Sequence, residues 1–132
     1  MLNRLTIKNV ALIDSAEIEF GEGLNVLSGE TGAGKSVLLD SINFALGAKA
    51  DKSMIRQSEC FVSACFLLGG DSPVFSELAE MGIEGEEEMI VSRRFRADGR
   101  GDIKINGSPV NATMLKKITA HLVDVHGQSE HF

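Results

Sequence analysis

A glycine-rich loop, GETGAGKS at 29–36, constrains the fold of this chain more than any other feature. Its first residue and its last three satisfy the pattern GxxxxGK[ST]. A short apolar segment at 24–29 leads into the loop and is typical of a strand inside a mostly parallel sheet. Apolar residues then recur at helical spacing, and Gly47 is placed to end the helix; they are Val37, Leu38, Ile42, Ala45 and Leu46. The order strand, glycine loop, helix predicts a P-loop rather than a chance turn ending in Lys-Ser.

Each residue type in this loop has a chemical reason. Glycines let the backbone turn so that successive N–H groups point at phosphate oxygens. The helix that follows directs the positive end of its dipole to the same place. Lys35 would bring a positive charge to the β and γ phosphates, and the Ser36 hydroxyl would ligate Mg²⁺. The candidate nucleotide-binding residues are Gly29, Glu30, Thr31, Gly32, Ala33, Gly34, Lys35, Ser36 and Val37.

The remaining segments predict an α/β fold in which antiparallel strands accompany the P-loop. Alternating apolar and polar residues, or apolar runs bounded by turns, predict strands at 5–10, 13–20, 59–68, 86–97 and 102–105. Asn106-Gly107 is a strong turn signal, so the later strands should form an antiparallel meander. Short helices are expected at 74–82 and 114–122, the second with Asn111 or Thr113 as N-cap. LVDVHGQ then predicts a buried strand leading into a loop.

Composition excludes several classes of protein. The 132 residues match one domain, and the 43% apolar content can fill its core. No apolar run approaches a membrane span and no signal peptide begins the chain, which favours the cytoplasm. A net charge of −6 argues against this segment wrapping nucleic acid by itself. Cys60 and Cys65 should lie on opposite faces of a strand, as reduced structural thiols.

Few other residues suggest chemistry. Asp124 lies in the middle of the apolar LVDV segment with no Glu after it, so either a metal carboxylate or a structural role is open. Gln128 follows that segment on a loop, where its amide could contact both Mg²⁺ and an attacking water, or simply be a surface glutamine. The spacing of five between His121, His126 and His131 does not predict a metal site.

A cluster of arginines lies on the strand expected at 86–97. Arg94 and Arg96 should face the same way, and for Arg93, Arg94 and Arg96 a solvated face is favoured over contact with a polyanion. The acidic run near 84–88 is expected to be a solvated loop. Neither group adds a site to the P-loop.

Several segments together resemble the RecN family, bacterial DNA repair ATPases of the SMC-like branch of the ABC proteins. They are LTIKNVALID, GLNVLSGETGAGKSVLLDSINFALGAKAD, DGRGDIKINGSPV and LVDVHGQSEH. The resemblance runs along the whole chain and implies that 29–36 is the Walker A loop. It also implies that Gln128 is the Q-loop glutamine that touches magnesium and senses the γ-phosphate. Arg56 matches an arginine common after the first helix of such heads, while Ser129 departs from the family's usual His.

The resemblance carries a function with it. It implies ATP binding with Mg²⁺, by Lys35 and Gln128 as catalytic residues and Ser36 and Gln128 as metal ligands. The whole protein would act in recombinational repair of DNA double-strand breaks in the bacterial cytoplasm, associated with the nucleoid. Its partners would be the C-terminal half of the head, a second protomer that completes an ATP sandwich, and DNA, but no membrane.

We expect residues 1–132 to be the incomplete N-terminal lobe of such a head, an ABC/SMC-like P-loop lobe with an antiparallel β-subdomain that ends after the Q-loop. The coiled-coil arms, the signature loop, the Walker B Asp with its catalytic Glu, and the switch His should lie further along. Weak binding of Mg-ATP and no turnover are therefore expected for this segment alone.

Two other functions stay open. A small-molecule or nucleotide kinase also uses a P-loop, but such kinases usually begin with the P-loop strand, whereas 28 residues precede Gly29 here. A nucleotide-dependent interaction module that docks a partner head without hydrolysis is the non-enzymatic alternative.

Overall fold

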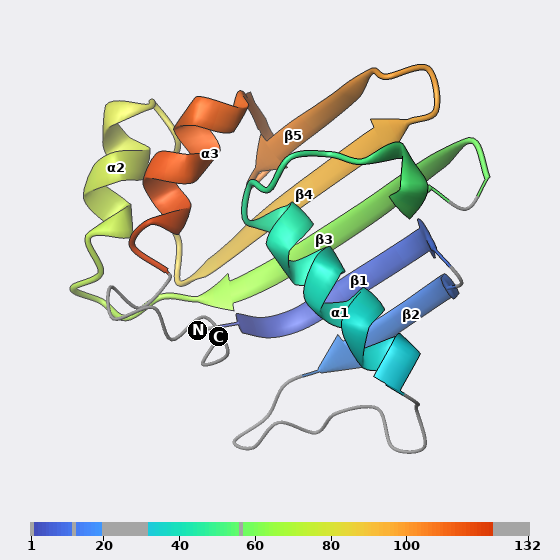
Figure 1. Cartoon of the computed structure of the whole chain (residues 1–132). Helices are drawn as coiled ribbons and strands as arrows, with labels where there is room; N and C mark the ends of the chain where they lie inside the picture. Colours follow the sequence, from blue (N-terminus) through green and yellow to red (C-terminus); the bar gives the residue numbers. More distant parts are fainter. Residues whose placement is uncertain (1, 12, 20–31, 56, 123–132) are drawn as a thin grey trace.

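The segments with alternating polarity form one antiparallel sheet. The computed structural model describes residues 2–11, 13–19, 32–55 and 57–122, with the backbone alone at 32–36. Within these residues six strands follow the order β2-β1-β3-β4-β5-β6, and every pair is antiparallel (Figure 1). The strands are β1 (Leu2–Val10), β2 (Ile13–Glu19), β3 (Glu59–Leu67), β4 (Glu88–Arg96), β5 (Gly101–Ile105) and β6 (Ser108–Val110). The predicted meander is confirmed, and it continues into a short strand, β6, that the sequence did not indicate.

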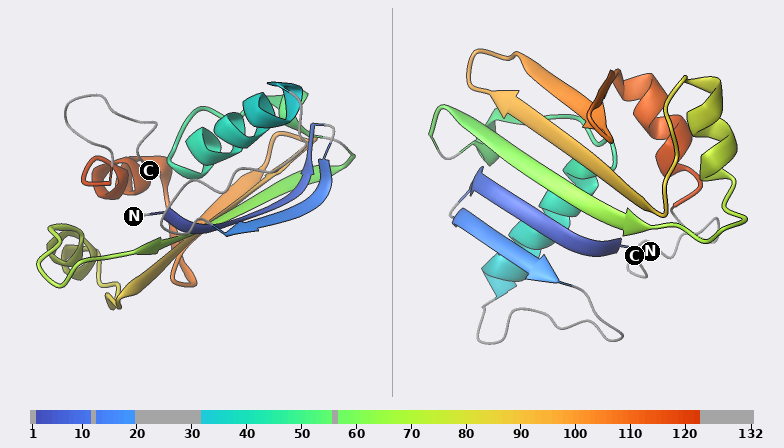
Figure 2. Two further views of the ribbon diagram at one scale, coloured as in Figure 1. Left: turned by 90° about the horizontal axis from the view of Figure 1, so that it is seen from below. Right: turned by 180° about the vertical axis from the view of Figure 1, so that it is seen from behind.

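Helices cover one face and one end of this sheet. They are α1 (Gly32–Ala45), α2 (Val74–Glu80) and α3 (Ala112–Thr119), with a 3₁₀ turn, η1 (Lys52–Met54), before β3. Figure 2 shows α1 lying along a single face, while α2 and α3 lie side by side at one end of the sheet. The helix predicted at 114–122 begins two residues earlier than expected, at Ala112, and ends three residues earlier, at Thr119.

Alternation along the strands explains which face α1 covers. On β3, Cys60, Val62, Ala64 and Phe66 are buried, whereas the residues between them are half-exposed. The antiparallel register aligns these residues with buried positions of the neighbouring strands, for example Leu5, Ala64, Val91 and Ile105 in one row. From α1, Leu38, Ile42 and Ala45 complete the same core. The hydrophobic effect therefore places α1 on this face, and among the described residues no helix lies along the other face, the open face.

Glycine ends α1 as the sequence predicts. Gly47 has a φ of 113°, a backbone conformation that residues other than glycine rarely adopt. The N–H of Ala48 donates to the carbonyl of Asn43 at 3.0 Å, and that of Gly47 to the carbonyl of Phe44 at 3.2 Å. These two bonds form a Schellman motif, which satisfies carbonyls that the helix leaves without partners.

Turn residues set the register of the last hairpin. Asn106 and Gly107 both have positive φ, at 51° and 85°, as the predicted tight turn requires. The Asn106 side chain also accepts a hydrogen bond from the N–H of Ile90 at 2.9 Å. The turn is thereby tied to β4 as well as closing the β5–β6 hairpin.

The two cysteines lie on opposite faces of β3, as expected. Cys60 is buried in the core, Cys65 is half-buried on the open face, and neither forms a disulfide. Burial raises the pKa of both thiols, which keeps them protonated and unreactive near neutral pH.

The alternation on β4 gives a test of the core. Met89 is fully buried and the next residue, Ile90, is 43% exposed on the opposite face. Met89→Ala should lower the free energy of unfolding by about 2–5 kcal/mol, because it leaves a cavity in the core. Ile90→Ala, of similar size, should cost less than about 1 kcal/mol. Urea denaturation of both variants measures this, and equal losses would show that the strand does not bury Met89.

The start of α3 gives a second test. The Asn111 side chain accepts a hydrogen bond from the N–H of Met114 at 2.8 Å, which identifies it as the N-cap, while Thr113 lies inside the helix. Asn111→Ala should therefore cost about 0.5–2 kcal/mol of stability. Thr113→Ala serves as the control and should change stability by much less. A larger loss at Thr113 in thermal unfolding would contradict the assignment.

Candidate functional site

The predicted phosphate loop leads directly into α1. The helix begins at Gly32, so the backbones of Lys35 and Ser36 belong to its first turns. Val37, the last of the candidate residues, is half-buried and packs against the core. Gly29, Glu30 and Thr31, and the side chains of 32–36, lie outside the described part, so their roles stay predictions.

The start of α1 suits an anionic group. Its first turn contains no acidic residue, so no side chain there neutralises the positive end of the helix dipole. Two of the first three residues, Gly32 and Gly34, have no side chain to obstruct the approach of a ligand to the backbone. The backbone N–H groups of this first turn, with Lys35 next along the helix, therefore suit a chain of phosphate groups.

Most of the other predicted site residues fall outside the described residues. These are Arg56, Asp124, His126, Gln128 and His131, and their roles also stay predictions. His121 is described, just after α3, and its Nε2 lies 3.6 Å from Oε1 of Glu77 on α2. Within the described part, no three His, Cys, Asp or Glu side chains gather as a metal site would require.

The arginines of β4 divide between the two faces of the sheet. Arg94 and Arg96 share the open face, as predicted, and both pair with Glu59: Nε of Arg94 is 2.7 Å from Oε2, and Nε of Arg96 is 3.6 Å from Oε1. Arg96 also lies 3.9 Å from Asp102. These partly exposed pairs bear out the solvated-face interpretation for Arg94 and Arg96.

For Arg93 the solvated-face interpretation is wrong. Its register partners are Val62 and Ile103, both buried, so its side chain starts from the face that α1 covers. Nη1 donates to the carbonyl oxygen of Phe44 at 2.8 Å and to that of Ala48 at 2.6 Å. The guanidinium also lies over the Phe44 ring, 4.3 Å from its centroid. Burial lowers its pKa, but a guanidinium in a protein keeps its proton.

The parity of β4 could have identified this role from sequence. Residues 89, 91 and 93 alternate onto one face, and the first two are plainly apolar. A charged residue in such a row needs a partner within the core. Which partner it finds depends on the helix that packs above, and that information is tertiary.

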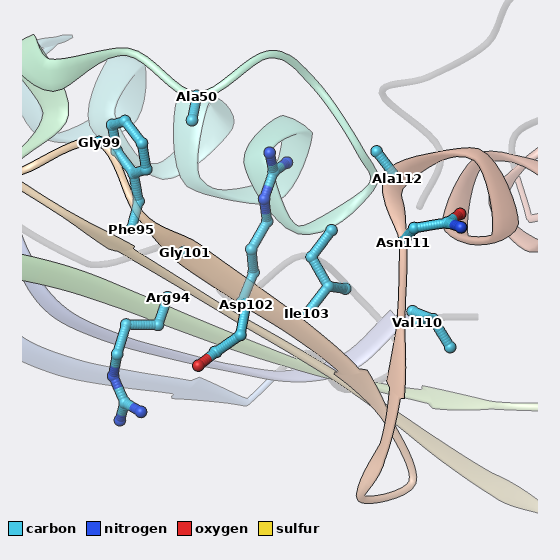
Figure 3. A pocket seen from close by; sticks show the side chains of 11 residues that line it. Ala50, Arg94, Phe95, Gly99, Gly101, Asp102, Ile103, Val110, Asn111 and Ala112 are labelled. Atoms are coloured by element: carbon cyan, nitrogen blue, oxygen red, sulfur yellow. The ribbon is translucent and has the colours of Figure 1, made fainter.

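A pocket of about 410 Å³ adjoins Arg93 at the C-terminal end of α1. Ala50, Ile103 and Val110 line it together with Asn111, as Figure 3 shows. Its lining residues come from β4, β5, β6, the start of α3 and the segment after α1, not from the helix end that carries Lys35.

Relatives of known sequence point to one group of proteins. The DNA repair protein RecN of Xylella fastidiosa (strain 9a5c) is 39% identical over 133 aligned residues, covering 99% of this chain and 24% of the relative. RecN of Treponema pallidum is 42% identical, with 99% and 24% covered. The chain thus spans about a quarter of the length of the curated relatives it matches.

Solved structures share the fold. A structure from work on ATP-driven dimerization and DNA-stimulated activation of SMC ATPases has a TM-score of 0.75 at 22% identity, with 96% of this chain and 82% of that one covered. The RecF recombination mediator structure described as RecF-ATPrS has a TM-score of 0.67 at 18% identity, covering 87% of this chain and 29% of that one. The predicted α/β fold class is confirmed, because the described residues share the fold of SMC head domains and of RecF.

None of the helices among the described residues has the length and apolar character needed to cross a membrane. The family described as the AAA domain matches residues 4–131, almost the entire chain. The chain therefore belongs to the AAA domain family, and in sequence it is a relative of the bacterial RecN proteins.

Proposed function

We propose that residues 29–36 bind the phosphates of Mg-ATP. The observation that carries this proposal is the start of α1 inside the GETGAGKS motif, with glycine and lysine but no acid in its first turns. A helix end of this composition attracts phosphate through its backbone N–H groups and its dipole. Membership of the AAA domain family supports the same function.

Individual residues take the following roles in this proposal. Lys35 places its charge at the β and γ phosphates, and the Ser36 hydroxyl faces the magnesium ion that accompanies ATP. Gln128 contributes a neutral amide to the same ion and to the attacking water. Bound Mg²⁺ would neutralise charge that develops on the phosphates.

We further propose that the whole protein is an ATPase of DNA repair, acting at double-strand breaks in recombination. The RecN relatives are DNA repair proteins by name, and similar folds come from SMC ATPases and from RecF bound to a nucleotide. Residues 1–132 form the N-terminal lobe of a head in this proposal. The C-terminal half, a second protomer and DNA would be its partners, in the bacterial cytoplasm and nucleoid.

The architecture argues against the kinase alternative. Strands β1 and β2 precede the loop and pair with β3 in an antiparallel sheet. Nucleotide kinases of the P-loop class usually begin instead with the P-loop strand. The non-hydrolysing docking module differs from the main proposal only in turnover, so a measurement of hydrolysis separates these two.

Lysine substitutions test the phosphate site. Lys35→Ala should weaken Mg-ATP binding about tenfold or more, because a hydrogen bond to a charged group contributes about 1.5–3 kcal/mol. Lys49→Ala removes an equal charge just beyond α1 and should leave the affinity unchanged. Titration with a fluorescent ATP analogue gives both affinities, and equal losses would show that ATP binds only by non-specific charge attraction.

The chain alone should show no steady ATP hydrolysis. Turnover that Lys35→Ala abolishes would contradict this expectation.

Magnesium dependence tests Gln128. Wild type should bind ATP more tightly with Mg²⁺ than with EDTA, and Gln128→Ala should reduce that gain while affecting binding in EDTA little. Gln57→Ala, at an exposed glutamine outside every helix and strand, is the control. A gain from Mg²⁺ that is identical in all three proteins would remove Gln128 from the metal site.

A further inference from the structure

Arg93 makes three contacts with the end of the helix that begins in the phosphate loop. Nη1 donates to two carbonyl oxygens, those of Phe44 and Ala48, at 2.8 and 2.6 Å, and the guanidinium lies over the Phe44 ring. Phe44 belongs to the last turn of α1, and Ala48 follows the glycine that ends it. Arg93 itself comes from the middle of the sheet, on β4.

These contacts are directional, whereas most of the packing of α1 is not. Leu38, Ile42 and Ala45 contribute apolar burial, which tolerates small sliding and rotation of a helix. Hydrogen bonds to two fixed carbonyl oxygens tolerate much less displacement, because they weaken quickly with distance and angle. Within the described residues, the side-chain hydrogen bonds recorded between the sheet and the end of α1 both come from Arg93.

Charge strengthens this attachment. The last carbonyls of a helix carry partial negative charge, and a cation beside them is favourable. The last turn of α1 contains no basic residue of its own. The half-buried position of Arg93 makes the interaction stronger than it would be in water.

Both ends of α1 are thus mechanically linked. A helix of 14 residues is a rod about 21 Å long. Holding one end against β4 therefore limits where the other end, with Lys35 and Ser36, can lie relative to the sheet. Arg94, the next residue on β4, lies on the other face of the sheet. Within the described residues it pairs with Glu59 and forms no hydrogen bond or ion pair with α1.

We propose that Arg93 is a positioning residue for the phosphate site: it holds the C-terminal end of α1 on the sheet and so sets the place of the phosphate-binding end. This inference rests on the proposed function of residues 29–36. It assigns a role in nucleotide binding to a residue that lies at the far end of the helix from the phosphates.

Matched variants of the whole natural chain test the proposal. Arg93→Met removes the charge and the donors but keeps a long side chain over Phe44. Arg93→Lys retains a cation with several donors, and Arg94→Met makes the same change as the first variant on the opposite face. Two measurements are made on each: hydrogen–deuterium exchange of α1 amides without nucleotide, and affinity for Mg-ATP at a temperature where circular dichroism shows the protein folded.

Arg93→Met should speed exchange in α1 but not in β1 and β3, and should weaken Mg-ATP binding about fivefold or more. Arg93→Lys should recover most of both losses, and Arg94→Met should match wild type in both. If Arg93→Met does not fold, Arg93→Gln takes its place with the same expected order of effects. Lys35→Ala is included to report on the phosphate site independently.

The outcomes are distinguishable. If Lys35→Ala loses ATP while Arg93→Met keeps wild-type affinity, Arg93 is only structural and the proposal is overturned, whatever its effect on stability. Equal effects of Arg93→Met and Arg94→Met would overturn it as well. If Lys35→Ala leaves ATP affinity unchanged, the proposed function itself fails, and the role of Arg93 at that site fails with it.

Discussion

The burial of one face of the sheet beneath α1 is the interaction on which the rest of this structure depends. The rows of apolar side chains on β1, β3 and β4 cannot remain in water without a large free-energy cost, and α1 supplies the surface that covers them. The glycine loop becomes the start of a positioned helix only because of this packing. The phosphate site that we propose at the start of α1 needs this helix to be held in place.

Apolar packing and polar attachment make different contributions here. Burial of Leu38 and Ile42 keeps α1 on the sheet, but it does not specify where along the sheet the helix lies. Arg93 adds that specification, since its hydrogen bonds end on particular carbonyl oxygens of the helix. A charge in the apolar row of β4 would be costly alone, and the helix end repays the cost by accepting its hydrogen bonds and complementing its charge.

The two faces of β4 show how neighbouring residues of one type can differ in role. Arg94 shares its face with Glu59 on the adjacent strand, and the pair lies partly in water, where such ion pairs contribute little stability. Arg93, one residue earlier, is turned by the pleat of the strand toward the helix. The chemistry of the two side chains is identical, so the difference comes entirely from what lies above each face.

Much of the architecture could be predicted from residue patterns alone. Alternation identified β1 to β5, Gly47 marked the end of α1, Asn106-Gly107 marked a turn, and the P-loop motif marked the start of α1. These features could be predicted because they depend on local backbone preferences and on the period of the side chains. The exact ends of α3 were less certain, since Asn111 and Thr113 are both good caps and only the hydrogen bond to Met114 distinguishes them. The short β6 was missed because a three-residue strand with a proline has almost no pattern of its own.

The sequence by itself determined the class of the site that we propose: a glycine loop, a lysine and a serine at the start of an apolar helix predict phosphate binding through residue types and spacing. The attachment of that helix to the sheet was decided by the tertiary structure alone. Arg93 and Phe44 are 49 residues apart, and no local preference links them. They meet because burial of the sheet face brings α1 over β4, and the contact is a consequence of the fold rather than of either segment.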